Sequence, residues 1–142
     1  MNLWPRFLYV LTVYVLLMLA APAWDLQPAD ADASFMLVLD DAVMCEAMDG
    51  LAPKNRAVVF SLGIGEVLCF TSFSNIANET AIYHKWYRSD QLSTSRKLTL
   101  KPPRWSTVSK IQFREADKGP WRVEIVDDTA RVLKTLRFSI TD

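Results

Sequence analysis

The stretch Trp121-Arg-Val-Glu-Ile-Val-Asp-Asp-Thr-Ala-Arg-Val-Leu-Lys-Thr-Leu-Arg-Phe-Ser-Ile140 carries the clearest fold signal in the chain. Apolar and polar residues alternate in both halves, which is the pattern of strands that bury one face. The polar tetrapeptide Asp127–Ala130 separates the halves and supplies a turn. The stretch therefore predicts an antiparallel hairpin. Its inward positions are Trp121, Val123 and Ile125 before the turn and Leu136, Phe138 and Ile140 after it.

Further short runs with strand character precede this hairpin. Residues 66–73 alternate, which places Val67, Cys69, Thr71 and Phe73 on one face. Other extended runs are expected at 35–39, 42–48, 81–88, 96–100 and 105–113. No convincing helical period follows residue 24. Seven or eight short strands separated by turns predict an all-β fold, an antiparallel two-sheet sandwich of the immunoglobulin-like kind.

Three tryptophans lie within these runs. Alternation places Trp86 with His84, and Trp121 with Val123, on inward faces, and Trp105 is expected to pack in the same way. We therefore predict a structural core that includes His84, Trp86, Trp105 and Trp121. A ligand-binding or catalytic role for His84, the sole histidine, is the weaker alternative, because catalysis would need an accessible imidazole beside an acid or a hydroxyl.

Length and charge set further bounds. A chain of 142 residues with 51% hydrophobic content holds one domain with a real core. Its 16 basic and 16 acidic residues cancel, and no like-charge block stands out, which argues against nucleic acid as a partner. One histidine and two cysteines give a metal site almost no support, and no nucleophile motif or dinucleotide loop is present. We expect no catalytic residue, no metal and no cofactor.

The first 23 residues have the pattern of an export segment. Arg6 precedes an apolar run of fifteen residues, Phe7–Ala21, which predicts a hydrophobic helix, and Ala21 and Ala23 have the small side chains that a signal peptidase recognises. Fifteen helical residues span about 22 Å, less than the roughly 30 Å hydrocarbon core of a bilayer. This length favours a cleaved signal peptide over residues 1–23.

An uncleaved anchor in the inner membrane is the alternative. Trp4 and Trp24 bracket the apolar run as interfacial anchors do, and the segment between them is long enough for one span if Arg6 snorkels. Either alternative places the rest of the chain in the periplasm or another extracytoplasmic space, because Arg6 holds the N-terminus inside. We expect residues 24–34 to be a connector and residues 35–142 to be the β-sandwich domain.

Export would place the two cysteines of the chain in an oxidising compartment. Cys45 and Cys69 are the only cysteines, and an even number in an oxidising compartment predicts a structural disulfide. Closing a loop of this size would stabilise the domain by about 3 kcal/mol. Two free, buried thiols are the alternative.

Several phrases in a fixed order resemble a known family. They are His84-x-Trp86, Arg104-Trp105, Ser109-Lys110, Gly119-x-Trp121-x-Val123 and Val132-Leu133 before Phe138, with Ala52-Pro53 and Cys69-Phe70-Thr71 also fitting. Over about residues 40–141 the chain resembles the bacterial family catalogued as domain of unknown function 2914. The resemblance implies an exported or membrane-attached β domain without an established activity. One departure is Ala130, where the family tends to place glycine, so a positive φ there would strain the alanine.

A binding surface is predicted on the outward face of the 81–88 strand. Tyr83, Lys85 and Tyr87 would line it with Arg88 at its end, because aromatic rings stack on sugars or bases and cations bind carboxylate or phosphate. Arg104, Lys110 and Arg114 are expected to extend this surface. The alternative is that these are ordinary half-exposed strand residues.

The sequence thus leads to two expectations for function. The first is a non-catalytic exported interaction or accessory domain, a membrane-attached subunit of a larger extracytoplasmic assembly, with other membrane or periplasmic proteins as partners. The second is a soluble periplasmic module that binds a glycan or an anionic polymer.

Overall fold

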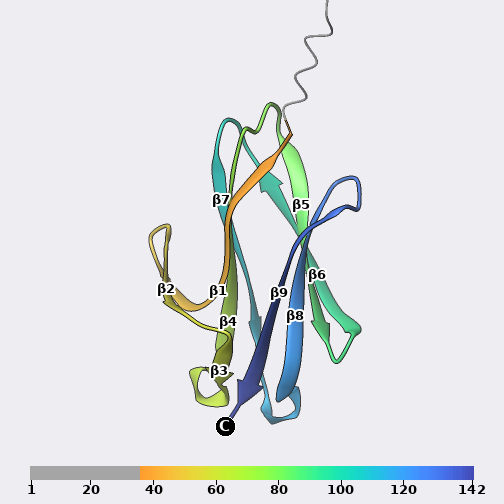
Figure 1. Cartoon of the computed structure of the whole chain (residues 1–142). Coiled ribbons are helices and arrows are strands. Elements are labelled where there is room, and N and C mark those ends of the chain that lie inside the picture. The colour runs from red at the N-terminus through yellow and green to blue at the C-terminus, as the bar shows by residue number, and fades with distance from the viewer. Residues whose placement is uncertain (1–35) are drawn as a thin grey trace, which may run out of the picture. The chain divides into compact units, whose positions relative to one another are not determined.

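The computed structural model describes residues 36–142, which form nine strands in two sheets (Figure 1). The predicted signal peptide or anchor, its hydrophobic helix and the whole connector lie outside these residues. Among residues 36–142, no helix is both long and apolar enough to cross a membrane. The strands are β1 (Val38–Asp49), β2 (Ala52–Arg56), β3 (Val59–Ser61), β4 (Glu66–Ser74), β5 (Thr80–Arg88), β6 (Gln91–Leu100), β7 (Trp105–Gln112), β8 (Gly119–Asp127) and β9 (Val132–Thr141), with short 3-10 turns η1 (Leu62–Ile64) and η2 (Glu115–Asp117).

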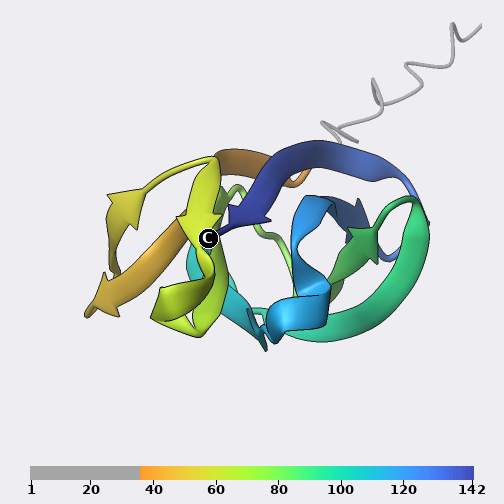
Figure 2. The same ribbon diagram turned by 90° about the horizontal axis from the view of Figure 1, so that it is seen from below.

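The two sheets face each other as layers (Figure 2). The four-stranded sheet has the order β2-β1-β4-β7, and the five-stranded sheet has the order β3-β9-β8-β5-β6. The predicted all-β fold of two sheets is therefore confirmed. Two details of the prediction were wrong, because the described part has nine strands and because β3 pairs with β9 in parallel.

The strand count differs for a local reason. Strands β2 and β3 are short and mostly exposed, so they lack the apolar alternation by which strands are recognised. The two runs predicted at 35–39 and 42–48 are instead joined in one long strand, β1, with an irregularity between Leu39 and Asp41. A bulge of this kind bends a strand without ending it.

The C-terminal hairpin forms with the expected faces. Trp121 lies opposite Phe138, and Val123 lies opposite Leu136. The ring of Phe138 stacks on Trp121 at 6.2 Å between centroids and meets the edges of Trp86 at 6.1 Å and Phe60 at 5.9 Å. Each such pair contributes about 0.5–1.5 kcal/mol beyond its buried area, so these rings form the centre of the core.

Trp105 is not part of this core. It pairs with Phe73, which is buried, yet its own side chain is 39% exposed. The reason is its place as the first residue of β7, an edge strand of the four-stranded sheet. The prediction of a core role for Trp105 was therefore wrong, whereas Trp86 and Trp121 are buried.

The cysteines form no disulfide in this structure, where both are free and buried. Cys69 lies opposite Met44, whereas Cys45 lies opposite Leu68, so the two thiols project from adjacent strands to opposite faces of the sheet. Cys69 joins the core between the sheets, and Cys45 packs with Leu68 and Phe70 on the outer face. This corrects the disulfide prediction in favour of two free thiols. Burial raises the pKa of Cys69, which keeps its thiol protonated.

The turn between β8 and β9 is held by Asp127. Its carboxylate accepts hydrogen bonds from Thr129 N, Thr129 Oγ1 and Arg131 N at 2.7–3.0 Å, and Arg131 Nε binds it at 3.0 Å. Burial opposes ionisation of Asp127, but the hydrogen bonds from Thr129 and Arg131 prevail and lower its pKa. The turn also requires a φ of 67° at Ala130, a left-handed conformation that favours glycine.

We expect a reducing agent to leave the unfolding temperature of the full-length protein unchanged, because no bond links Cys45 and Cys69. A thiol reagent added to the denatured, unreduced monomer should titrate both cysteines. A clear loss of stability in dithiothreitol, or fewer reactive thiols, would contradict the structure.

We expect Ala130→Gly to raise the free energy of unfolding by about 0.5–1 kcal/mol. Glycine adopts the left-handed conformation without strain, and the larger entropy that it gives the unfolded chain offsets only part of this gain. Chemical denaturation of the full chain measures the change. Ala77→Gly, at an exposed position without a positive φ, is the matched control and should be neutral or destabilising. Destabilisation by Ala130→Gly would show that the turn is not under strain.

Candidate functional site

His84 is fully buried between the two sheets. Its Nε2 lies 3.1 Å from Thr71 Oγ1 and its Nδ1 lies 2.7 Å from Ser109 Oγ, and Trp86 Nε1 donates to Ser109 Oγ at 3.2 Å. One consistent arrangement of hydrogens has Ser109 donating to Nδ1 and Nε2–H donating to Thr71. Each ring nitrogen therefore has a partner, and no substrate can reach the imidazole unless the sheets separate.

Burial lowers the pKa of His84 to about 4, because the charged imidazolium would lose its hydration. The folded protein thus keeps His84 neutral at pH values at which an exposed histidine is protonated. This side chain is suited to joining the sheets by neutral hydrogen bonds.

The predicted tyrosine surface lies on the outer face of the five-stranded sheet. Tyr83, Lys85 and Tyr87 alternate with the buried residues of β5 and are half-buried. Tyr87 is stacked under the Arg122 guanidinium, 4.1 Å from its ring, and Arg122 also binds Glu124 at 3.1 Å. Burial and the neighbouring Glu124 raise the pKa of Tyr87, which keeps its hydroxyl neutral. Sequence reasoning missed Arg122 and Glu124, because they come from β8 and reach β5 only through strand pairing.

The four cations predicted beside Tyr83, Lys85 and Tyr87 all bind acidic residues, and Arg114 lies 4.0 Å from Asp117. Arg88 lies at the end of β5 and binds Asp117 beside η2 at 3.6 Å. Arg104 precedes β7 and lies 3.7 Å from Asp40. Lys110 binds Glu66 at 3.0 Å on the four-stranded sheet. The predicted surface of seven residues is therefore divided, and only its two tyrosines and Lys85 share one face.

The structure instead reveals a cationic edge, which we define as Arg96, Lys97, Lys101, Arg104, Lys110 and Arg114. All six side chains are exposed, and the 24 residues from Gln91 to Arg114 that contain them have no acidic residue. The other described residues carry nine basic and thirteen acidic side chains. The balanced total charge conceals this segregation of basic residues along the chain.

This segment forms β6 and β7, which are edge strands of different sheets. Ion pairs hold three of the six cations, Arg104, Lys110 and Arg114, at distances of 3.0–4.0 Å. The other three have no carboxylate partner within residues 36–142. Because exposed pairs contribute about 0–1 kcal/mol, incoming anions can compete for all six.

A cleft of about 380 Å³ lies between these edges. Arg96 projects from β6, Lys110 and Gln112 project from β7, and Arg114 follows, with Trp121 also lining the cleft. Its one carboxylate, Asp117, accepts the Arg114 backbone N–H at 2.8 Å and pairs with Arg88. Three cations around one engaged carboxylate make the cleft suitable for an anionic group. In the described part of the chain, no cluster of His, Cys, Asp or Glu could hold a metal ion.

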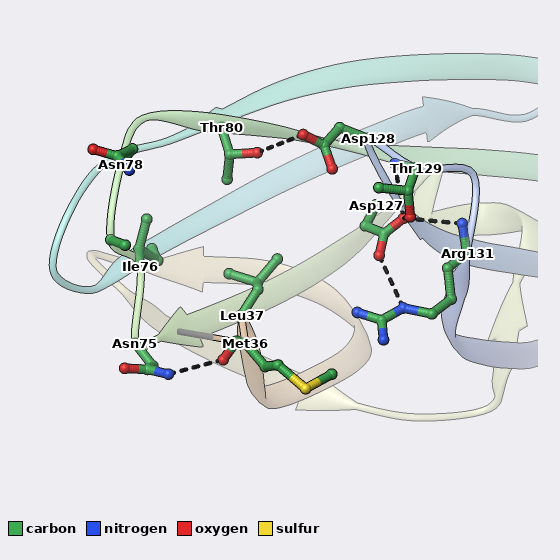
Figure 3. Close-up of a pocket in the computed structure, with 11 residues that line it drawn as sticks. Met36, Leu37, Asn75, Ile76, Asn78, Thr80, Asp127, Asp128, Thr129 and Arg131 are labelled. Atoms are coloured by element: carbon green, nitrogen blue, oxygen red, sulfur yellow. Dashed lines mark hydrogen bonds and ion pairs between the residues drawn. The ribbon is translucent and has the colours of Figure 1, made fainter. Parts of the chain in front are cut away.

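A second pocket, of about 430 Å³, lies beside the β8–β9 turn (Figure 3). Its polar groups are already engaged: Asn75 Nδ2 donates to Met36 O at 2.9 Å, and Thr80 Oγ1 donates to Asp128 at 3.1 Å. Asp127 points to Thr129 and Arg131 in the same view. These contacts stabilise the turns, so this pocket is a weaker candidate than the cationic cleft.

We expect the free energy of unfolding to fall by about 2–3 kcal/mol between pH 7 and ~4.5 through His84, because the unfolded chain takes up a proton near pH 6.5 and the folded chain resists protonation down to about 4. The contribution of His84 to stability is therefore fully present above the pKa of this residue in the unfolded chain, and it is lost as the pH falls from there towards the pKa in the folded protein. Urea unfolding of the full chain at both pH values measures it, and His84→Asn, which does not titrate, should flatten the slope. An equal slope in wild type and variant would contradict a buried neutral His84.

Comparisons with solved structures find distant likeness. The chain is similar to part of a β-glucosidase from Listeria innocua in complex with glucose, at 11% identity and a TM-score of 0.46 over 75% of this chain. It is also similar to a mutant of that enzyme in complex with laminaribiose, at 10% identity and a TM-score of 0.45. The chain covers 16% of each enzyme, and we draw no inference from this likeness.

A search of curated proteins found no match. A family model described as "Protein of unknown function (DUF2914)" matches residues 79–140, which contain β5 to β8 and all of β9 except its last residue. The match includes both strands of the cationic edge but not the first four strands, so it covers less of the chain than the resemblance inferred from the sequence. Over residues 79–140, the chain is thus similar to the DUF2914 family of proteins of unknown function.

Proposed function

We propose that this protein is a non-catalytic, exported interaction domain that binds an acidic surface of a partner protein through its cationic edge. One observation carries the proposal: the segment from Gln91 to Arg114 has six basic and no acidic residues, and it forms two neighbouring edge strands around a cleft. The partner would be another membrane or periplasmic protein within a larger extracytoplasmic assembly.

Electrostatics gives this edge its selectivity. Complementary charge accelerates encounter and disfavours basic partners, and its effect weakens with added salt. Guanidinium groups at Arg96 and Arg114 can each bind a carboxylate through two parallel hydrogen bonds, and Lys110 adds a third donor at the cleft. An acidic patch or segment of a partner matches this arrangement.

The sequence supports export and attachment. Arg6 and the apolar run up to Ala21 supply a leader, and Trp4 and Trp24 would anchor it if it stays uncleaved. Within the proposal, an uncleaved segment tethers an immunoglobulin-like sandwich close to the outer face of the inner membrane. Intact-mass analysis of the mature protein distinguishes the two forms, because a start at Trp24 would remove the anchor from the proposal.

The decisive experiment neutralises the cleft in the full-length protein. In Arg96→Ser/Lys110→Ser/Arg114→Ser, we expect the amount of co-purifying membrane or periplasmic partner to fall at least about tenfold, a loss equivalent to about 1.4 kcal/mol. Quantitative mass spectrometry after affinity purification at low salt measures this recovery, and the purified partner should bind in a salt-sensitive manner.

Lys54→Ser/Lys134→Ser/Arg137→Ser is the matched control, because it removes the same charge from exposed positions outside the edge. It should keep wild-type recovery. Equal recovery with both triple variants would refute the cationic edge as the docking surface, and loss with both would show that only net charge matters.

The second candidate function is binding of an anionic polymer, such as an acidic glycan, by a soluble periplasmic module. The same acid-free edge favours it, because a polyanion could follow β6 and β7 without meeting a carboxylate. Alginate and single-stranded DNA distinguish the cases: selective, saturable binding of alginate by wild type would support the polymer, whereas equal weak binding of both polymers reflects charge alone.

A further inference from the structure

Strand β7 pairs on one side only, because it is the last strand of the four-stranded sheet. Its eight residues pair with β4 in an unbroken register, and nothing in the described part of the chain pairs with its other side. Proteins often block such an edge with a proline or a bulge, and β7 has neither. The edge is therefore long and regular enough to accept a further strand.

The hydrogen-bond pattern shows which residues of β7 have free backbone groups. Phe113, directly after the strand, donates its backbone N–H to Gly65 O, at 3.0 Å. Residues of an antiparallel pair direct their backbone groups alternately towards the partner strand and away from it, and the β4–β7 register continues without a shift from this bond to Trp105. The residues whose N–H and C=O groups point away from β4 are therefore Ser106, Val108, Lys110 and Gln112.

The cationic cleft lies along this free edge. Lys110, Ile111 and Gln112 are consecutive residues of β7, and all three line the cleft. Their side chains alternate between the two faces of the sheet, so one cleft reaches all three only at the edge of the strand. The free backbone groups of Lys110 and Gln112 thus border the cleft that Arg96 and Arg114 also line.

The outer face of β7 offers contacts that suit an acidic strand. Arg114 has an extended backbone, with a φ of −123° and a ψ of 169°, so it continues the row of Val108, Lys110 and Gln112. Val108 is 39% exposed and lies beside Phe70 of β4. An added strand with an apolar side chain beside Val108 and carboxylates beside Lys110 and Arg114 gains about 0.2–1 kcal/mol from each cross-strand contact.

We propose that an acidic, extended segment of the partner protein adds to the free edge of β7 as a fifth strand of the four-stranded sheet. Backbone hydrogen bonds to the edge supply affinity, and the carboxylates and the apolar residue of the segment supply specificity. This inference deepens the proposed function and rests on it, because it assigns a binding mode to the cationic edge.

The charges of the edge disfavour a second copy of the chain as the added strand. Two β7 edges in contact would bring basic side chains together, and no acidic residue lies between Gln91 and Arg114 to pair with them. An acidic segment of another protein meets no such repulsion.

The test separates backbone pairing from charge in the full-length protein. Val108→Pro removes a free N–H from the edge and keeps every cation, and proline is tolerated where the N–H of an edge strand faces solvent. Val108→Thr is the matched control, because it changes the side chain but keeps the N–H and the β-branched shape. In affinity purification at low salt, we expect partner recovery to fall at least about tenfold with Val108→Pro and by a clearly smaller factor with Val108→Thr.

Two further measurements make the result independent of a single variant. Ser106→Pro removes another free N–H near the start of β7, where proline is better tolerated, and should also lower recovery about tenfold. Hydrogen exchange on the wild-type chain needs no variant. When the purified partner is added, exchange of the Val108, Lys110 and Gln112 amides should slow at least about tenfold, because each N–H enters a ladder hydrogen bond.

The outcomes distinguish this binding mode from the proposed function. Lower recovery with the proline variants and slower exchange of the edge amides would support strand addition. Wild-type recovery in a folded proline variant, equal loss with Val108→Thr, or unchanged exchange of the edge amides would overturn it and leave docking by charge intact. A dimer of the chain that Val108→Pro abolishes would also overturn it, because the edge would then belong to a second copy. Equal recovery with wild type and Arg96→Ser/Lys110→Ser/Arg114→Ser would instead refute the proposed function, on which strand addition rests.

Discussion

A short chain of hydrogen bonds crosses the interior and fixes the register of one sheet against the other. His84 of the five-stranded sheet contacts Thr71 and Ser109 of the four-stranded sheet, and Trp86 donates to the same serine. A slip between the sheets would leave buried polar groups without partners, at about 1–3 kcal/mol each. Apolar packing around Phe138 supplies most of the attraction but has no direction. The polar link therefore decides which residues face each other.

The proposed binding surfaces depend on this register. Ser109 holds β7 against the interior, so the next residue, Lys110, projects outward and reaches the cleft between β6 and β7. Both strands are free along one side, and basic side chains on such edges also discourage pairing with other chains. The same charges thus disfavour edge-to-edge pairing and attract an acidic partner.

Particular residues show where sequence reasoning succeeded and where it failed. Val67 and Val123 were correctly assigned inward, because the pleat of a strand sets alternation locally. Trp105 follows the same alternation but lies at the end of an edge strand, and no local pattern reveals whether the opposite sheet covers it. The prediction of a disulfide between Cys45 and Cys69 failed for a related reason. The spacing of two cysteines along the chain does not reveal that their paired strands direct the two thiols to opposite faces of the sheet.

The sequence by itself determined the class of fold, most of the strands, the C-terminal hairpin and the inward positions, because backbone geometry expresses these in periods of a few residues. Only the tertiary structure decided that β6 and β7 are edge strands and that Arg96, Lys110 and Arg114 therefore line one cleft. Those arrangements arise from pairing between strands that are distant in the chain. The stability of this pairing depends on contacts across the sandwich, which cannot be predicted from a local sequence pattern.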